Sequence, residues 1–275
     1  MAVKDTLLCL DLSFEDCLYR ICRDDNGSKR VVYVAVMNLE IIPEQSRTYG
    51  PDVIRELSKL KEWYDMWDTI TVYKDQTGIR TELDAFEPHA LSEQQILGNY
   101  ELFDILELPV VQSLKTRVFR IELKGRRCYL KIARFGFELG WLAQEIQVYH
   151  LLYQYSSKLS PRILGYAFEQ RSHRVIGFVI EEVIGRRPSI TDFETCKVAL
   201  QELHDLDIIH GDINRDNIFI TNEGARFIDF EETCIDPAEN RGDWDKKKSD
   251  EMDSLEEKLL DESGKGRPWA TGNAE

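Results

Sequence analysis

The chain has 275 residues, 43% of them hydrophobic, which is enough apolar content for one large core or two smaller ones. Its formal net charge of −15 argues against broad binding to nucleic acid or to an anionic membrane, because both depend on basic surface. No apolar run reaches the length of a membrane-spanning helix, and the amino terminus lacks the pattern of a signal peptide. We therefore expect a cytoplasmic protein, with the nucleus as the alternative, and neither nucleic acid nor membrane as a partner.

The cysteines form no recognisable metal-binding or disulfide pattern. They are scattered and none belongs to a C-x-x-C pair, so we expect reduced thiols in place of a zinc site or a disulfide framework. The acidic excess either favours a cationic substrate or partner or serves solubility alone, because overall charge says little about a particular cleft.

Residues 1–105 predict a β-rich extension. Its expected elements are strands at 7–12, 17–22 and 31–37, a turn at 24–27, a helix at 53–64, and a strand at 69–73 that continues through a turn at 75–78 into a further strand. No catalytic constellation occurs here. The extension is either a separate module for a substrate or partner, or an addition to the sheet of the next domain, and we favour the second alternative.

The following segment predicts a β-hairpin and an amphipathic helix. Alternating apolar residues at 118–123 and 127–133 flank a Lys-Gly-Arg turn, which places Lys131 on the second strand. Apolar residues recur at helical spacing in 139–153, and Glu145 lies next to that stripe. Each residue alone is more typical of a solvated side chain.

A buried-type strand at 175–180 runs into residues 181–185, and a helix is expected at 191–206. Thr191 is the candidate N-cap of this helix, with Glu194 at the capping-box position. The helix leads to the most informative stretch of the chain, His210-Gly211-Asp212-Ile213-Asn214-Arg215-Asp216-Asn217, which is followed by Ile228-Asp229-Phe230.

Asp212, Asn217 and Asp229 supply the groups that phosphoryl transfer from ATP requires. That reaction needs a carboxylate near the attacking hydroxyl and hard oxygen ligands for Mg²⁺. A hairpin with strands at 218–220 and 226–228 would bring Asn217 and Asp229 to the same end. Either motif alone is better interpreted as an acidic loop or an ordinary hairpin, whereas the joint pattern favours phosphoryl transfer.

These motifs resemble those of the protein kinase-like superfamily. The H-G-D-x-x-x-x-N form is similar to that of aminoglycoside, choline and other small-molecule kinases, and the whole set resembles the short stand-alone kinase-like proteins frequent in fungal genomes. The resemblance implies that Asp212 is the catalytic base and that Asn217 and Asp229 hold Mg²⁺. It also implies that Lys131, oriented by Glu145, holds the α- and β-phosphates of ATP.

By the same resemblance, residues 181–185 form the hinge between two lobes. The backbone of Glu181 and Val183 would then contact adenine.

Several positions depart from the family pattern. Residues 113–117 contain no glycine where a glycine-rich phosphate loop is expected; Lys115 and Arg117 either supply positive charge there or are solvated. Glu231 replaces the glycine that follows the Asp-Phe pair, and no A-P-E motif follows. Arg215 either steadies the transferred phosphoryl group or faces solvent.

The expected fold is α+β, with a two-lobed protein kinase-like domain at 106–262 after the β-rich extension. We assign the small lobe to 106–180, the hinge to 181–185, a reduced helical lobe to 186–262 and a flexible tail to 263–275. An amphipathic helix is expected at 249–260.

The expected function is ATP- and Mg²⁺-dependent transfer to an unidentified hydroxyl-bearing acceptor. A small molecule is favoured over protein Ser or Thr. A small-molecule acceptor requires an enclosed acidic pocket beside Asp212, and a protein acceptor requires an open groove. The alternative is a pseudokinase that acts as a nucleotide-binding or scaffold module.

Overall fold

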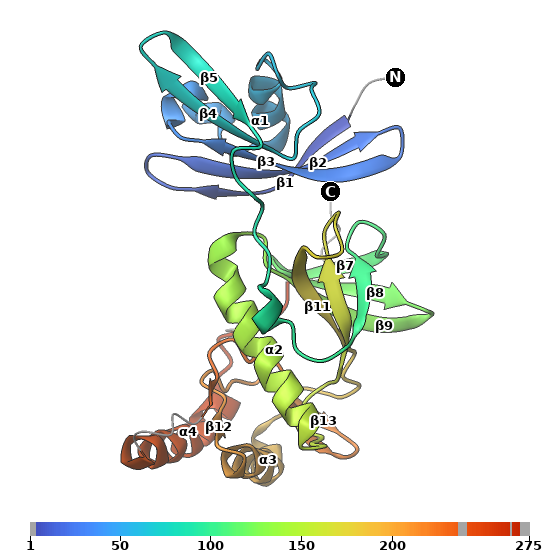
Figure 1. Cartoon of the computed structure of the whole chain (residues 1–275). Coiled ribbons are helices and arrows are strands. Elements are labelled where there is room, and N and C mark those ends of the chain that lie inside the picture. Colours follow the sequence, from blue (N-terminus) through green and yellow to red (C-terminus); the bar gives the residue numbers. More distant parts are fainter. Residues whose placement is uncertain (1–3, 236–240, 265, 270–275) are drawn as a thin grey trace.

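The computed structural model describes residues 4–235, 241–264 and 266–269. Its fold is α+β: two β-sheets and two short strand pairs combine with four α-helices in the described part of the chain. Figure 1 shows the first sheet at the top with the helix of residues 50–57 beside it, the second sheet below with a long helix along it, and the helices of residues 193–205 and 241–260 at the bottom. Among the described residues, no helix has both the length and the apolar character needed to cross a bilayer.

The first sheet has the strand order β1-β2-β3-β4-β5. All its strand pairs are antiparallel except β3 and β4, which are parallel. Asn26 and Gly27, both with positive φ, form the predicted turn between β2 and β3. The elements are β1 (Lys4–Leu12), β2 (Cys17–Asp25), β3 (Ser28–Val36), β4 (Thr69–Asp75), β5 (Gly78–Leu83) and the helix α1 (Gly50–Leu57).

Strand β6 (Glu101–Asp104) lies within the extension and joins the second sheet, as the favoured alternative expects. The first sheet departs from that alternative. Its strands pair only with one another and enclose a hydrophobic core of their own. The helix expected at 53–64 was also predicted too long, because α1 ends at Leu57. Tight turns after it bring Trp63 and Trp67 into the core, where the Arg23 guanidinium lies 4.7 and 4.6 Å from their ring centroids.

The second sheet has the order β6-β10-β11-β9-β8-β7, with β7 at one edge. The helix α2 (Leu139–Gln154) packs against it through Leu142, Ile146 and Tyr149. Lys124 and Gly125 form the predicted turn between β8 and β9. The strands are β6 (Glu101–Asp104), β7 (Val110–Lys115), β8 (Val118–Leu123), β9 (Arg126–Ile132), β10 (Ile163–Phe168) and β11 (Val175–Glu181).

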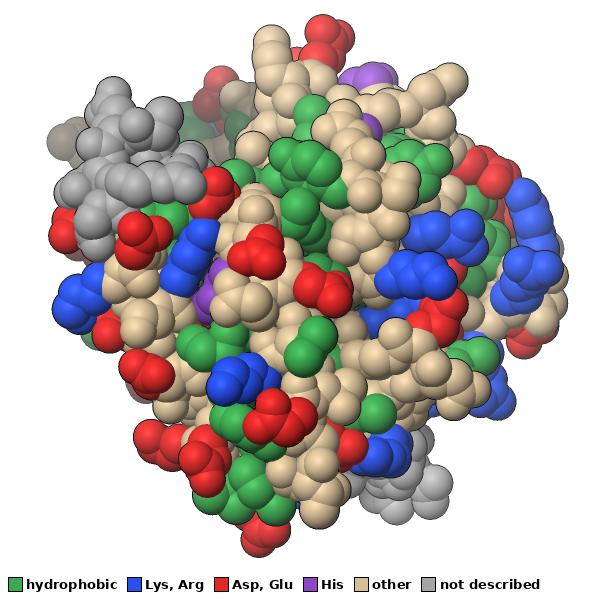
Figure 2. Space-filling view, turned by 90° about the horizontal axis from the view of Figure 1, so that it is seen from below, with side chains coloured by type: hydrophobic (Ala, Val, Ile, Leu, Met, Phe, Trp, Pro, Cys, Tyr) green, Lys and Arg blue, Asp and Glu red, His purple; other side chains and the backbone are tan. Residues whose placement is uncertain are grey.

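The remaining described elements lie below the second sheet. The helices α3 (Phe193–Asp205) and α4 (Arg241–Leu260) pack against each other. Two short antiparallel pairs join β12 (Ile208–Ile209) to β15 (Cys234–Ile235) and β13 (Ile218–Thr221) to β14 (Gly224–Phe227). Figure 2 views the molecule from this side, and acidic and basic side chains are interspersed over the face.

Two helix predictions in this part need correction. The chain enters α3 through a short 3₁₀ turn whose capping box uses Ser189 and Asp192, so Thr191 and Glu194 are not the capping pair. The helix expected at 249–260 begins earlier, at Arg241, where the charged sequence gave no apolar stripe. All six cysteines are free thiols in the structure.

A buried charge network joins the two sheets. Glu169, at 0% exposure, follows β10 and forms ion pairs with Arg20 of β2 and with Arg174. The Tyr33 hydroxyl donates to its carboxylate at 2.8 Å. Burial alone would raise the pKa of Glu169, but the two guanidinium groups hold that pKa below its ordinary value.

Replacing Glu169 by alanine is expected to lower the free energy of unfolding by about 3–5 kcal/mol, because it leaves two buried guanidinium groups without a counter-charge. Urea denaturation measures this change. Glu223 is the matched control, since it also accepts from two cations, Lys158 and Arg226, at a position that is 48% exposed. Glu223→Ala should cost less than about 1 kcal/mol, and equal losses in the two variants would contradict the prediction.

Candidate functional site

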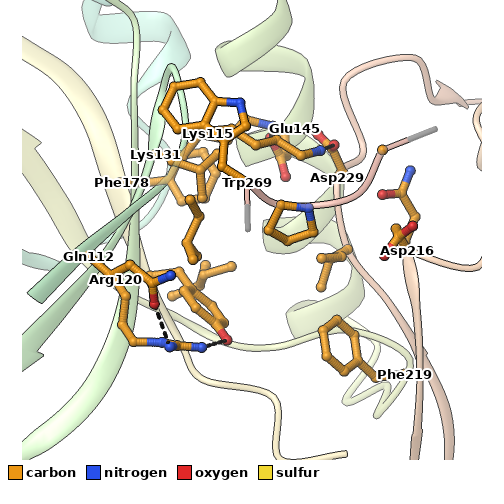
Figure 3. A pocket seen from close by; sticks show the side chains of 18 of the residues that line it. Gln112, Lys115, Arg120, Lys131, Glu145, Phe178, Asp216, Phe219, Asp229 and Trp269 are labelled. Carbon is orange, nitrogen blue, oxygen red and sulfur yellow. Dashed lines mark hydrogen bonds and ion pairs between the residues drawn. The ribbon is translucent and has the colours of Figure 1, made fainter. Parts of the chain in front are cut away.

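A cavity of about 330 Å³ lies between the second sheet and the hairpin β13–β14. Figure 3 shows Lys115, Lys131, Glu145 and Trp269 on one side of it and Asp216 and Phe219 on another. Of the predicted site residues, the cavity brings together Lys131, Glu145, Asn217 and Asp229. Its wall also includes the apolar side chains Leu114, Val118, Phe178, Ile180 and Ile228.

The loop that follows β12 is held from two sides. The ring of His210 is fully buried, and its Nε2 lies 3.1 Å from the carbonyl oxygen of Ile228. Burial lowers the pKa of His210, so the ring is expected to be neutral at pH 7. From α4, the Glu251 carboxylate accepts from the amides of His210 at 3.2 Å and Gly211 at 2.7 Å. The sequence gave no signal for this role of Glu251, because it depends on how α4 packs.

Asp212 and Asn217 are linked directly through their side chains. Asn217 Nδ2 donates to Asp212 Oδ2 at 3.1 Å and to its carbonyl oxygen at 2.9 Å. Asn214 Nδ2 donates to the same two oxygens of Asp212, at 3.2 and 3.1 Å. These bonds hold the Asp212 carboxylate beside Asn217, although Asp212 itself does not line the large cavity.

The hairpin β13–β14 brings Asn217 and Asp229 to one end, as the sequence predicts. Ile218 pairs with Phe227, and the amide of Ile228 donates to the Asn217 carbonyl at 3.0 Å. Asp229 has a φ of 66°, a left-handed conformation that asparagine and aspartate tolerate better than most residues. Both side chains line the cavity from this end.

Lys131 is the centre of the charged cluster. Its ammonium lies 2.6 Å from Glu145, 2.6 Å from Asp229 and 3.0 Å from Glu231. Burial would lower the pKa of Lys131, but the three carboxylates raise it above its ordinary value. Burial raises the pKa of Glu145, while Lys131 and Lys115 hold the pKa of Asp229 below its usual range against the effect of its own burial.

The turn between β7 and β8 presents two cations to the same cluster. Lys115 lies 3.4 Å from Asp229. Arg117 pairs with Glu231 at 2.8 Å and donates to the Ile132 carbonyl at 3.0 Å. Glu231, which the sequence marked only as a missing glycine, therefore connects this turn to Lys131. Its partners are too far away in sequence to be found from the motif.

The structure places the predicted hinge residues outside the cavity wall. The lining reaches Ile180 on β11, but neither Glu181 nor Val183 belongs to it. The Glu181 carboxylate pairs with Arg162 at 3.1 Å, and Val183 is buried. Their expected backbone contact with adenine stays a prediction.

The described part of the tail contributes to the site, because Gly266, Pro268 and Trp269 line the cavity. The Trp269 amide donates to the Leu114 carbonyl at 2.8 Å, so this segment adds to the exposed edge of β7. A polar, glycine-rich sequence predicted a flexible end from residue 263, and the contact with β7 could not be seen from it. The residues from 270 onward lie outside the described part.

Oxygen ligands for a metal ion are available at the end of the hairpin. Asp229 and Asn217 offer a carboxylate and an amide oxygen beside the cavity, which fits the preference of Mg²⁺ for a few hard protein ligands. Ligand atoms of Glu145, Asp229 and Glu231 also lie within 4.8 Å of one another. Lys131 contacts all three carboxylates, so it neutralises much of the charge that a cation would require.

The comparisons with known proteins add no family to this description. No family model matches the chain, and no curated protein has a significant match to it. The fold and the arrangement of the site thus define an α+β protein with a lysine–carboxylate cluster at the wall of a cavity between a sheet and a hairpin.

Proposed function

We propose that the protein is a phosphotransferase of the protein kinase-like type, which moves the γ-phosphoryl group of ATP to a hydroxyl group with the help of Mg²⁺. The observation that carries this proposal is the buried Lys131 ammonium, 2.6 Å from both Glu145 and Asp229 at the wall of a cavity that Asn217 also lines. A buried lysine beside several carboxylates is expensive to maintain for stability alone. The arrangement suits an ammonium group that binds phosphate oxygens.

The proposal includes a two-lobed domain. The second sheet with α2 would be the small lobe, and α3, α4 and the two short strand pairs would be the reduced helical lobe. Support comes from the position of the cavity between these parts and from β11, which leaves the sheet at Glu181 where the hinge is assigned. The first sheet carries none of the proposed catalytic residues.

Each group has a distinct task in this mechanism. Lys131 would hold the α- and β-phosphates, with Glu145 fixing its position. The acceptor oxygen forms a bond to the γ-phosphorus while the bond to the β–γ bridging oxygen breaks; ADP leaves, and Asp212 takes the hydroxyl proton. When Mg²⁺ is bound by Asn217 and Asp229, it neutralises charge on the phosphates.

Lys115 would replace part of the missing glycine-rich loop. A turn without glycine brings its backbone close to phosphate less readily, but the Lys115 ammonium already reaches the cavity and is 34% exposed. Arg117 is held by Glu231 and by the Ile132 carbonyl, so Lys115 is the freer of the two cations. Lys115 would contact the nucleotide phosphates from this position.

A nucleotide-binding pseudokinase is the second candidate. Two observations favour it: the absence of glycine from 113–117, and the position of Pro268 and Trp269 at the wall of the cavity. Retention of Asp212, Asn217 and Asp229 favours the enzyme.

The test is Mg²⁺-dependent ATP binding and slow ATP hydrolysis by the purified protein, with Asp212→Asn beside wild type. We expect the variant to bind ATP with Mg²⁺ as well as wild type does, and to lose turnover by about 100-fold or more because its amide cannot accept the proton. Trp269, the one tryptophan at the cavity wall, serves as a fluorescence reporter of binding. ATP binding without turnover in either protein would favour the pseudokinase, and absence of ATP binding would end both proposals.

A further inference from the structure

A second, smaller cavity lies beside the loop that carries Asp212. It is lined by Arg187, by Asn214–Asp216, by Lys258 near the end of α4 and by Asp261, Gly264 and Arg267 after α4, and its volume is about 80 Å³. Four of these residues are cations and two are carboxylates, in a chain whose net charge is −15.

Several of these cations have no carboxylate close enough to neutralise their charge. Among the described residues, Arg215 pairs only with the carboxylate of Glu262, at 4.0 Å, on a side chain that is 89% exposed. Lys258 and Arg267 form no ion pair within the part of the chain that the structure describes. The carboxylate oxygens of Asp261 accept from Ser263 at 2.8 and 3.0 Å.

Arg187 is held in place at the same cavity. Its guanidinium pairs with Asp216 at 3.2 Å and stacks on Phe219, 4.2 Å from the ring centroid. Burial lowers the pKa of Arg187, and the like charge of Arg267 acts in the same direction. Like charges brought together around a small polar cavity favour an anion between them.

The cavity is also positioned for the reaction. Asn214, which forms part of its wall, donates to the Asp212 carboxylate at 3.2 Å. Asn214 Oδ1 accepts from the amides of Asp216 and Asn217 at 2.9 and 3.1 Å, so this side chain is firmly held. A ligand anchored against Asn214 would carry its neighbouring hydroxyl toward Asp212.

We propose that this cavity is an anion subsite of the acceptor and that the acceptor is a small hydroxyl compound bearing a phosphate or carboxylate group. The inference rests on the proposed phosphotransferase function. It differs from the acidic pocket expected beside Asp212 and from the cationic substrate that was one alternative interpretation of the acidic excess. The cavity is large enough for one such group, and Arg215 and Arg267 offer guanidinium geometry suited to bidentate contacts with either one.

The test uses the full chain and three probes at constant ionic strength: inorganic phosphate, 3-hydroxypropanoate and the neutral 1,3-propanediol. Calorimetry should detect binding of an anion and none of the diol. Phosphate alone points to a phosphorylated acceptor, and 3-hydroxypropanoate alone or together with phosphate extends the site to carboxylates. Lys258→Ala should raise the Kd of the bound anion about tenfold, because it removes a charged partner.

Lys246→Ala is the matched control, since Lys246 lies on the same helix, is 74% exposed and pairs with Asp250. It should leave the Kd unchanged. The inference is overturned if no anion binds, if the diol binds as well as the anions, if Lys258→Ala matches wild type, or if Lys131→Ala abolishes binding instead. Failure of the proposed function is distinguished by a separate measurement, because wild type would then not bind ATP.

Discussion

Replacing Asp229 by alanine is expected to lower ATP turnover by roughly 1000-fold or more. The variant loses the carboxylate proposed to bind Mg²⁺, and it releases Lys115 and Lys131 from a shared partner. ATP binding should therefore persist but lose its dependence on Mg²⁺. Titration of ATP with and without Mg²⁺, together with a turnover assay, measures both effects.

Glu231→Gln is the control for this prediction. Glu231 also contacts Lys131, at 3.0 Å, and removing its charge changes the same cluster without touching the proposed metal ligand. Its turnover should remain within about fivefold of wild type, since the amide can still accept from Arg117. Mg²⁺ dependence that survives in Asp229→Ala but is lost in Glu231→Gln would move the metal site to Glu231.

Replacing Gly211 by alanine is expected to lower the free energy of unfolding by about 3–5 kcal/mol. Gly211 has a φ of +83°, and a Cβ there would lie 2.1 Å from the Glu232 carbonyl oxygen. The Glu232 carbonyl belongs to the backbone and cannot rotate aside as the end of a flexible side chain can. The loop must therefore shift, which disturbs its hydrogen bond to Glu251. Urea denaturation measures the loss, and turnover should fall with it because Asp212 is the next residue.

Gly125→Ala separates the effect of the Glu232 contact from the strain of a left-handed backbone. Gly125 has a similar φ of +75°, but nothing lies within 4 Å of the position that its Cβ would take. Alanine there should cost only about 1–2 kcal/mol, the strain of a left-handed backbone alone. Equal losses in Gly125→Ala and Gly211→Ala would contradict the role of the Glu232 contact.

Much of the secondary structure was predictable because it depends on local patterns. The turns at Asn26-Gly27 and Lys124-Gly125, the strand that carries Lys131 and the helix that carries Glu145 all lie where periodicity and turn chemistry place them. The errors fall at helix ends. The length of α1 depends on burial of Trp63 and Trp67 after it, which tertiary packing decides.

The candidate site also combines residues that local spacing predicts with residues that only tertiary packing brings in. The placement of Asn217 and Asp229 at the two ends of a hairpin was sufficient to predict that both lie at the same end of it, because a hairpin brings its own two ends together. Glu231, Glu251 and Trp269 were not predictable as site residues. Each acts on a partner at least 40 residues away: Lys131 for Glu231, Gly211 for Glu251 and Leu114 for Trp269.

The sequence by itself determined the α+β character and the order of most elements, since these follow from short-range spacing. The residues proposed for phosphoryl transfer follow from motif spacing together with the resemblance that the motifs carry. Only the tertiary structure decided that the first five strands form a sheet of their own and that three carboxylates surround Lys131. It also decided that cations gather beside Asn214 despite the negative charge of the chain. The reason is that burial and charge neutralisation depend on distances between segments far apart in the chain, whereas composition gives only the total charge of the whole chain.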